Sequence, residues 1–429
     1  MKSPKLEENA PCRRELGDGL VLKTAASEED IDRVAECHDI VFGEEENIGE
    51  MCRRLFLYHP NTQHSDLIFV EDEKTAEVVS SLCLIPWQWR YENAVLKVGE
   101  MGIVGTKEEY RRRGLIRAQA DYLKEQLMER GFHLSQIQGI PYFYRQFGYE
   151  YTLPLIGGHR VELHQVPDLK EDAKPAFTCR LATVEDLPII KRLYNEAAQD
   201  LQINTCRDDA IWKYLWEHSP ATETACGCWV VEDVDGSVIG YFRVEKHGFG
   251  SGVNVAEVSR LSYEAALTVL RQLKKLAVER EKPYIRLALP KDCALVRTAH
   301  YHGANDLGTY AWQIHIPDMA WLLSAIGPAL ERRLAESPFA GLTEEVKLNF
   351  YREAVALHFA EGKLKRVQKL DSGEGSIRIP PRAAVPLVLG YRSREELKNS
   401  WPDLGMPSKE AYLIDVLFPR MVSHIYTIY

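Results

Sequence analysis

The sequence predicts a mixed α/β (α+β) fold of three units, the second of which is a degenerate copy of the first. The chain has 429 residues, more than one hydrophobic core usually accommodates. Its composition, 45% hydrophobic and 27% charged residues, is that of a folded globular protein. Segments with helical apolar spacing alternate with short apolar runs typical of strands. An opening pattern near residue 22 recurs near residue 179, which indicates a duplication.

The first unit is expected to cover residues 19–160, after a flexible tail at residues 1–18. Ser27 and Asp30 form a capping pattern ahead of an amphipathic helix. Gly131 follows a second helical segment, at the position where a glycine commonly ends a helix. The strands expected in this unit cover residues 67–70, 78–89, 95–106 and 134–138, and the second helix covers residues 115–129.

Two further units follow a linker-like stretch at residues 166–177, which carries prolines and charges. Thr183 and Asp186 repeat the capping pattern, so residues 176–309 are assigned to the degenerate copy. The pattern changes near residue 310, and residues 310–429 are assigned to a third, α+β unit. Within it, a helix is expected at residues 319–334 and strands at residues 347–350 and 354–359.

Charge and cysteine content exclude several classes of protein. The net charge of -10, from 53 basic and 63 acidic residues, argues against general nucleic-acid binding. No apolar run approaches the ~18 residues that a membrane span requires, and the first 16 residues lack the apolar core of a secretory signal. Nine scattered cysteines fit reduced thiols, and His300 and His302 have no third ligand nearby for a metal. We therefore expect a cytoplasmic protein without a metal site.

The strongest chemical signal is a run of three arginines, Arg111, Arg112 and Arg113, followed by Gly114 at a predicted helix start. Cations at a helix N-terminus oppose the helix dipole, at about 0.3–1 kcal/mol each. A bound anion would offset this cost, because helix N–H groups and arginine side chains both bind phosphate. No Gly-Lys-Ser/Thr follows, so this is not a Walker loop. A phosphate-binding loop is predicted, and a solvated charge run is the alternative.

Two motifs resemble those of GNAT N-acetyltransferases. Residues 111–116, Arg-Arg-Arg-Gly-Leu-Ile, resemble the acetyl-CoA pyrophosphate loop, although Ile116 replaces the usual small residue, as in the Eis-like (enhanced intracellular survival) branch. Residues 139–149, Gly-Ile-Pro-Tyr-Phe-Tyr-Arg-Gln-Phe-Gly-Tyr, resemble the Tyr-x-x-Phe-Gly-Phe/Tyr segment. The resemblance implies that Tyr144 protonates the leaving thiolate; without it, Tyr144 would be read as a packed aromatic. The acetyl-CoA contacts that it implies are Val104, Gly105, Thr106, Arg111, Arg112, Arg113, Gly114, Leu115, Ile116, Arg117, Gly139 and Ile140.

The resemblance to Eis-like proteins extends over most of the chain. It implies two tandem GNAT-like domains, a sterol-carrier-like C-terminal domain and a homo-oligomer, a trimer or hexamer. It also implies that the terminal carboxylate, here on Tyr429, enters the active site as the base. Glu100, on a predicted central strand, is the alternative base. The non-functional interpretation of Glu100 is an ordinary strand charge that faces solvent. The loop at Arg260 lacks both the arginine trio and the glycine, so the second unit is not expected to bind CoA.

Together these features predict an acetyl-CoA-dependent N-acetyltransferase, with no metal cofactor. The expected acceptor is an amine on a small molecule, such as an aminoglycoside or a polyamine, or on a lysine side chain. Two alternatives stay open: a non-catalytic acyl-CoA-binding regulatory protein, and a lipid carrier, which rests on fold analogy alone.

Overall fold

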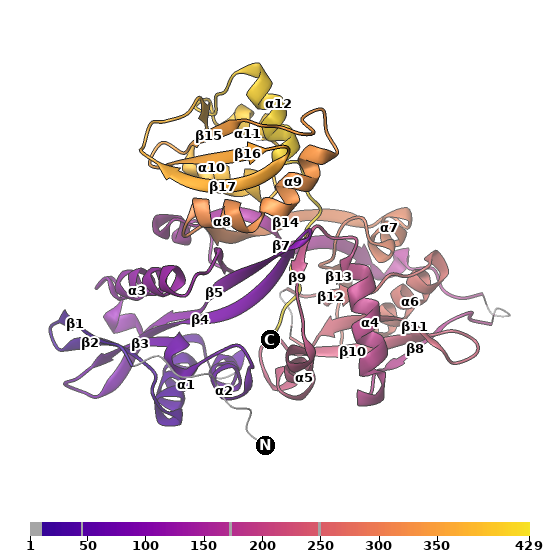
Figure 1. Ribbon diagram of the computed structural model, residues 1–429. Coiled ribbons are helices and arrows are strands. Elements are labelled where there is room, and N and C mark those ends of the chain that lie inside the picture. Colours follow the sequence, from indigo (N-terminus) through magenta and orange to yellow (C-terminus); the bar gives the residue numbers. More distant parts are fainter. Residues whose placement is uncertain (1–10, 44–45, 171–173, 248–249) are drawn as a thin grey trace.

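The structure, a computed structural model, describes residues 11–43, 46–170, 174–247 and 250–429 (Figure 1). The chain forms three units. The first two share one continuous 14-stranded sheet, and the third carries a separate four-stranded sheet. Within the described ranges, no helix has the length and apolar character needed to cross a membrane. The predicted mixed α/β fold with a C-terminal α+β unit is confirmed.

In the first unit, helices pack on a mostly antiparallel sheet. The Ser27 side chain accepts the N–H of Asp30 and begins the first helix, as the capping pattern predicts. The apolar stripe of that helix, which includes Ile31 and Val34, is buried. The elements of this unit are β1 (Arg13–Gly17), β2 (Leu20–Thr24), α1 (Glu28–Phe42), α2 (Ile48–Tyr58), β3 (Leu67–Asp72), β4 (Glu77–Tyr91), β5 (Ala94–Thr106), the 3-10 turn η3 (Glu108–Tyr110), α3 (Leu115–Glu129), β6 (Leu134–Ile137), the 3-10 turn η4 (Phe143–Phe147) and β7 (Glu150–Glu162).

The prediction of a flexible tail at residues 1–18 is wrong for residues 13–17, which form β1. Strand β1 pairs antiparallel with β2. Asp18 and Gly19 join the two strands with φ values of 57° and 83°, the left-handed conformation of a tight hairpin turn. The side chains of β1 are exposed and mainly charged, which is why the strand lacks an apolar signal. The first ten residues of the predicted tail lie outside the described residues.

The element order of the second unit is similar to that of the first, except that β9 lies between its two helices and the α-helix α7 stands where the first unit has a 3-10 turn. Its capping pair also recurs, since Asp186 accepts the N–H of Thr183 at 2.7 Å. The elements are β8 (Thr178–Leu181), α4 (Leu187–Ala198), β9 (Ile203–Thr205), α5 (Asp209–Glu217), β10 (Cys226–Glu232), β11 (Val238–Glu245), β12 (Val253–Val258), α6 (Tyr263–Glu279), β13 (Tyr284–Leu287), α7 (Ala294–Tyr301) and β14 (Asn305–His315).

The last strands of these two units are exchanged between them. The sheet order around the junction is β6-β14-β7-β13. The end of β14 pairs with β6 of the first unit, and the end of β7 pairs with β13 of the second. Strand β7 therefore runs beyond the expected boundary at residue 160, and β14 crosses the one at residue 310. A further pairing between the units joins β9 to β4.

The third unit packs helices against the sheet of order β17-β16-β15-β18. The helix expected at residues 319–334 is two helices, because Gly327 and Pro328 interrupt it and the proline occupies a helix start. The elements are α8 (Met319–Ala325), α9 (Gly327–Ala335), β15 (Glu345–Asn349), β16 (Ala354–Ala360), β17 (Lys363–Leu370), β18 (Ile377–Arg378), α10 (Pro381–Val388), α11 (Arg394–Ser400) and α12 (Ser408–Leu417).

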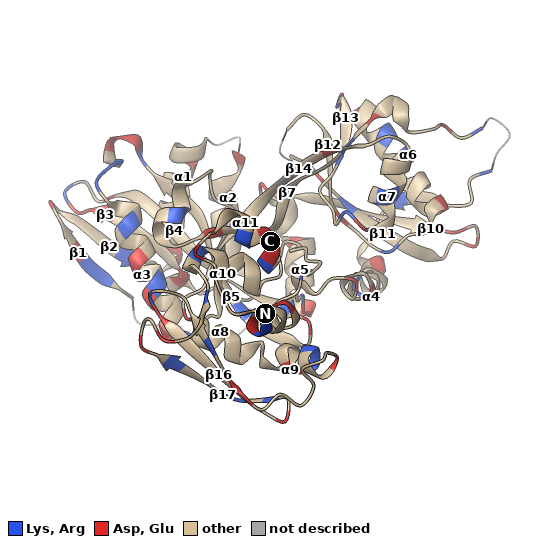
Figure 2. Cartoon of the chain, turned by 90° about the horizontal axis from the view of Figure 1, so that it is seen from above, with Lys and Arg blue, Asp and Glu red and all other residues tan. Residues whose placement is uncertain are grey.

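The C-terminal tail, residues 418–429, leaves the third unit and returns between the first two. Figures 1 and 2 both show the chain end at the centre of the molecule, between the lobe with α1 and the lobe with α6. Ile425, Ile428 and Tyr429 are buried. They belong to a hydrophobic core that includes residues of all three units. The apolar ending of the chain is therefore packed inside the molecule.

Candidate active site

The sheet of the first unit opens at β5. Strand β5 pairs in parallel with β6 over only three residues, the last of which is Glu100. Beyond that point, the register of β4 with β5 shifts between the pairs Ser81–Gly105 and Cys83–Gly102, so that β5 carries one extra residue. Ile103, inside this bulge, has a φ of 45°, a strained value for a β-branched residue. The bulge turns the backbone at Val104 away from regular pairing.

The arginine loop links this opening to α3. Arg111, Arg112 and Arg113 are exposed, as is Gly114. The Nε of Arg111 donates to the carbonyl of Thr106 at 3.3 Å, and Arg113 lies over the ring of Tyr110. Gly114 stands before α3 with a φ of 79°, and the first turn of α3 holds no acidic residue and no side-chain cap. The helix N–H groups and the arginines are thus available to an anion.

The second motif forms a compact loop after β6. Tyr144 is buried among Phe143, Phe147 and Tyr149. Burial raises its pKa, so the phenol stays protonated at neutral pH. Gly139 packs against the ring: a Cβ at this position would lie 2.1 Å from Cδ2 of Tyr144. Only glycine lets the backbone approach the tyrosine so closely.

Strand β14 of the second unit holds this loop. The Tyr310 hydroxyl donates to the carbonyl of Gly139. Nε2 of Gln313 donates to the same carbonyl at 3.0 Å and to that of Ile140 at 3.3 Å. Neither residue is marked by a local motif, because both come from a strand more than 150 residues away. The exchange of strands therefore places second-unit side chains beside the tyrosine loop.

The two motifs meet at the start of α3. Nη2 of Arg117 donates to Oε1 of Gln146 at 2.9 Å, and its guanidinium lies over the ring of Phe147. The arginine loop, the first turn of α3 and the tyrosine loop thus form one continuous edge of the site. Ile116, which departs from the usual small residue, is partly buried at this edge.

The two candidate bases, Glu100 and Tyr429, are in direct contact. The Tyr429 hydroxyl donates to Oε1 of Glu100 at 2.9 Å, and Gln136 donates to Oε2 at 3.3 Å. Glu100 is 2% exposed, so its interpretation as a solvent-facing strand charge is wrong. Burial raises its pKa to about 7, although hydrogen bonds from Tyr429, Gln136 and Trp87 partly oppose the shift. The ring of Tyr429 packs edge-on against Trp87, and the Thr427 hydroxyl donates to the Tyr429 main-chain oxygen at 2.8 Å.

A second acidic group lies near this pair. Burial and the charges of Glu245 and Glu46 raise the pKa of Glu223 to about 7. The charge of Glu223 in turn contributes to raising the pKa of Tyr429, after burial and the contact with Glu100. This end of the site therefore holds two carboxyl groups that titrate near neutral pH, whereas the arginine loop is electropositive.

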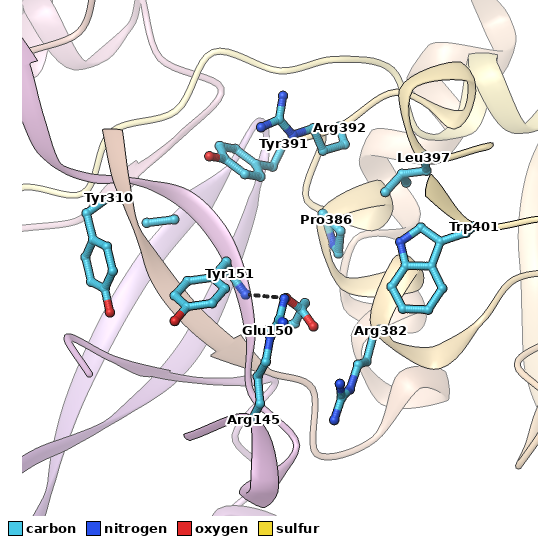
Figure 3. Close-up of a pocket in the computed structure, with 11 residues that line it drawn as sticks. Arg145, Glu150, Tyr151, Tyr310, Arg382, Pro386, Tyr391, Arg392, Leu397 and Trp401 are labelled. Atoms are coloured by element: carbon cyan, nitrogen blue, oxygen red, sulfur yellow. Dashed lines mark hydrogen bonds and ion pairs between the residues drawn. The ribbon is translucent and has the colours of Figure 1, made fainter. Parts of the chain in front are cut away.

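A cavity of about 380 Å³ lies between the first and third units (Figure 3). Arg145, next to Tyr144 in the chain, reaches into it and pairs with Glu150. Trp401 and Arg382 close it from the third unit. Neither Glu100, Tyr144 nor Tyr429 lines this cavity, so it flanks the tyrosine loop and is separate from the reacting groups.

Comparison with known proteins assigns the class of the first unit. Residues 24–152 match the acetyltransferase (GNAT) domain family. The chain therefore contains a GNAT acetyltransferase domain, and this domain carries the bulge, the arginine loop and Tyr144. A comparison with curated proteins gave no match.

Solved structures extend the likeness over the full length. A GCN5-related N-acetyltransferase from Anabaena variabilis is 18% identical with a TM-score of 0.69, over 95% of this chain and 99% of that one. An Enterococcus faecalis protein of unknown function, described as a probable N-acyltransferase, is 15% identical with a TM-score of 0.71, over 98% and 100%. Eis1 from Mycobacterium abscessus is 14% identical with a TM-score of 0.61, over 95% and 99%. At these identities the likeness shows the fold.

Proposed function

We propose that the protein is an acetyl-CoA-dependent N-acetyltransferase whose active site lies in the first unit, residues 19–160. The observation that carries the proposal is the joining of the arginine loop and the Tyr144 loop at one opening of the sheet. The opposite side of that opening holds the Glu100–Tyr429 pair. The proposed anion site and acid therefore meet at the start of α3, and the proposed base lies on β5.

Each group has a defined role in this proposal. The arginine loop and the start of α3 hold the pyrophosphate of acetyl-CoA. Backbone N–H groups around Val104 donate to the carbonyl oxygen of the acetyl group, where negative charge develops. Tyr144, kept protonated by burial, donates its proton to the leaving thiolate, whose own pKa is about 8.5.

The base is assigned to the Glu100–Tyr429 pair. A carboxylate with a pKa of about 7 is well matched to accept a proton from an ammonium near neutral pH. The Tyr429 hydroxyl, which already donates to Glu100, can relay that proton by accepting from the amine. The terminal carboxylate of Tyr429, beside the Thr427 hydroxyl, is the second candidate for the base.

The acceptor is proposed to be a cationic amine. Glu100 and Glu223 make the acceptor end acidic, and carboxylates concentrate cationic substrates by electrostatic attraction. Aminoglycosides, polyamines and lysine side chains all carry such amines. The homo-oligomer and the sterol-carrier-like nature of the third unit stay predictions.

The second unit is proposed not to bind CoA. Its helix α6 begins at Ser262, whose side chain accepts the N–H of Ala265, and Glu264 lies in the first turn. Arg260 is held by Asp200 through bonds of 2.7 and 2.8 Å. A capped, acidic helix start repels an anion, in contrast to the open start of α3.

Thiol release from acetyl-CoA tests the proposal across aminoglycosides, polyamines, arylamines and lysine peptides. Tyr144→Phe is expected to lower kcat by about a hundredfold, the lower end for general acid catalysis, and to leave the Kd for acetyl-CoA nearly unchanged. Tyr301→Phe is the matched control, since Tyr301 is 78% exposed in the second unit. Tight acetyl-CoA binding with no turnover of any amine would replace this proposal with the acyl-CoA-binding regulatory function.

A further inference from the structure

We propose that the second unit is a clamp that positions the C-terminal tail, with Thr205 and Arg207 as its positioning residues. The clamp holds Tyr429 against Glu100. The catalytic consequence rests on the proposed function, whereas the clamp itself is a property of the fold and can be tested without an acceptor.

Side chains of the first two units bind three consecutive backbone carbonyls of the tail, those of residues 426–428. Thr205 donates its hydroxyl to the first at 2.6 Å. Arg207 donates Nε and Nη2 to the second, at 3.0 and 2.6 Å. Nε2 of His59 lies 3.3 Å from the third. Three successive anchors fix both the position of the tail along its axis and its rotation.

His59 is arranged as a donor toward the tail. Its Nδ1 accepts the backbone N–H of Asn61 at 3.3 Å, which leaves the ring proton on Nε2. Burial lowers its pKa to about 3, so the ring is neutral at physiological pH. The interaction with the tail is therefore a neutral hydrogen bond from the first unit, and the charged anchor comes from the second.

Arg207 is itself rigidly held. Its guanidinium makes two bonds to Glu257, at 2.9 and 2.7 Å, and both side chains are almost fully buried. The hydroxyl of Tyr241 donates to the same carboxylate at 2.6 Å. The guanidinium also lies 4.5 Å from the ring centre of Tyr194 and 4.8 Å from that of Trp212. These contacts fix the orientation of the guanidinium, which donates its other hydrogen bonds to the Thr427 carbonyl of the tail.

A buried arginine ion pair stabilises a core no more than apolar side chains of similar volume, because removing the charges from water costs free energy. The planar guanidinium instead fixes the directions in which its hydrogen bonds are donated. The clamp is tied to the active site as well. Thr205 ends β9, which pairs with β4 opposite Trp89, two residues from the Trp87 ring that packs on Tyr429.

The test is amide hydrogen exchange of the full-length protein, read on peptides that cover residues 421–429, beside kcat and the Kd for acetyl-CoA. Thr205→Val keeps the side-chain shape and removes the donor. We expect tail exchange to become about tenfold faster and kcat to fall about tenfold, as for one lost buried hydrogen bond. The Kd for acetyl-CoA should stay within about twofold. Thr205→Ser, which restores the hydroxyl, should recover both values.

Thr268→Val is the control, because among the described residues the Thr268 hydroxyl bonds only to the carbonyl of Glu264, one turn earlier in α6. Tail exchange in Thr205→Val that equals the wild-type rate would overturn the clamp. So would a rise spread evenly over the chain, which would indicate general destabilisation. If the wild type transfers acetyl to no amine, the proposed function fails, while the exchange measurement still decides the clamp.

Discussion

Glu100 illustrates how the surroundings of one side chain determine its chemistry. In the unfolded chain its carboxyl would titrate near 4.3. Burial between Tyr429 and Gln136 raises the pKa to about 7. The sequence identifies Glu100 as a candidate but not as a buried one, because the residues that cover it lie 36 and 329 positions away. Tyr144, in contrast, is marked as a candidate by a motif that is local in the sequence.

Glu100→Gln is expected to separate catalysis from stability. Because the folded pKa lies above the unfolded value, the stability contributed by the protonated carboxyl is complete below about pH 4.3 and is lost as pH rises through about 7. At pH 8 the ionised group costs up to about 3 kcal/mol. The variant should therefore melt at a higher temperature than wild type at pH 8, and at the same temperature at pH 4.

Melting curves at the two pH values, with the rate measured beside them, check this expectation. The rate of wild type should rise with pH through about 7, and the variant should lose that rise together with most of its activity. Glu336→Gln, on a side chain 67% exposed, is the control. A variant that keeps the wild-type pH profile would exclude Glu100 as the base.

Among the elements, the loop between β6 and β7 shows what local sequence cannot provide. The motif predicts the loop and its tyrosine, but its conformation is fixed by Tyr310 and Gln313 of β14. The helix expected at residues 319–334 shows a different limit. Its apolar spacing continues across Gly327 and Pro328, so periodicity alone does not reveal the break.

Gly139→Ala is expected to displace the ring of Tyr144. The added methyl would lie 2.1 Å from Cδ2 of that ring and 2.8 Å from Nε2 of Gln313, so the tyrosine must move. A displacement of about 1 Å at a reacting group can lower kcat about a hundredfold. Steady-state kinetics would measure this loss, with Gly227→Ala as control, because the nearest atom to its added methyl is 3.7 Å away. Unchanged kcat would show that the position of Tyr144 is not critical.

Across the complete chain, the three units share one hydrophobic core. The β4–β5 hairpin of the first unit also enters the third. There Arg333 donates to Glu92 at 2.9 Å and to the hydroxyl of Tyr91 at 3.2 Å. The Tyr91 hydroxyl donates to the carbonyl of Val388 at 2.7 Å. The sequence reveals three units because each has its own pattern, but it does not reveal these contacts between them.

We expect the chain to unfold in one cooperative calorimetric transition. Arg333→Ala removes the buried arginine that pairs with Glu92 and donates to the carbonyl of Leu417, while Arg332 still pairs with Glu92. Removing one partner from a buried ion pair typically costs about 3–5 kcal/mol, which lowers the Tm of a chain this long by about 4 °C. Arg382→Ala, on an exposed arginine of the third unit, should change the Tm little. Two resolved transitions in the wild type would contradict a shared core.

The exchange of β7 and β14 constrains how the protein is made. During translation, the first unit emerges from the ribosome well before β14, the strand that fills the position between β6 and β7. Until about 315 residues have been synthesised, β6 therefore presents an unpaired edge, the kind of surface that recruits other chains. The loop that carries Tyr144 can reach its final conformation only after β14 has been synthesised, because Tyr310 and Gln313 of β14 hold it. The first two units must therefore complete their folding together.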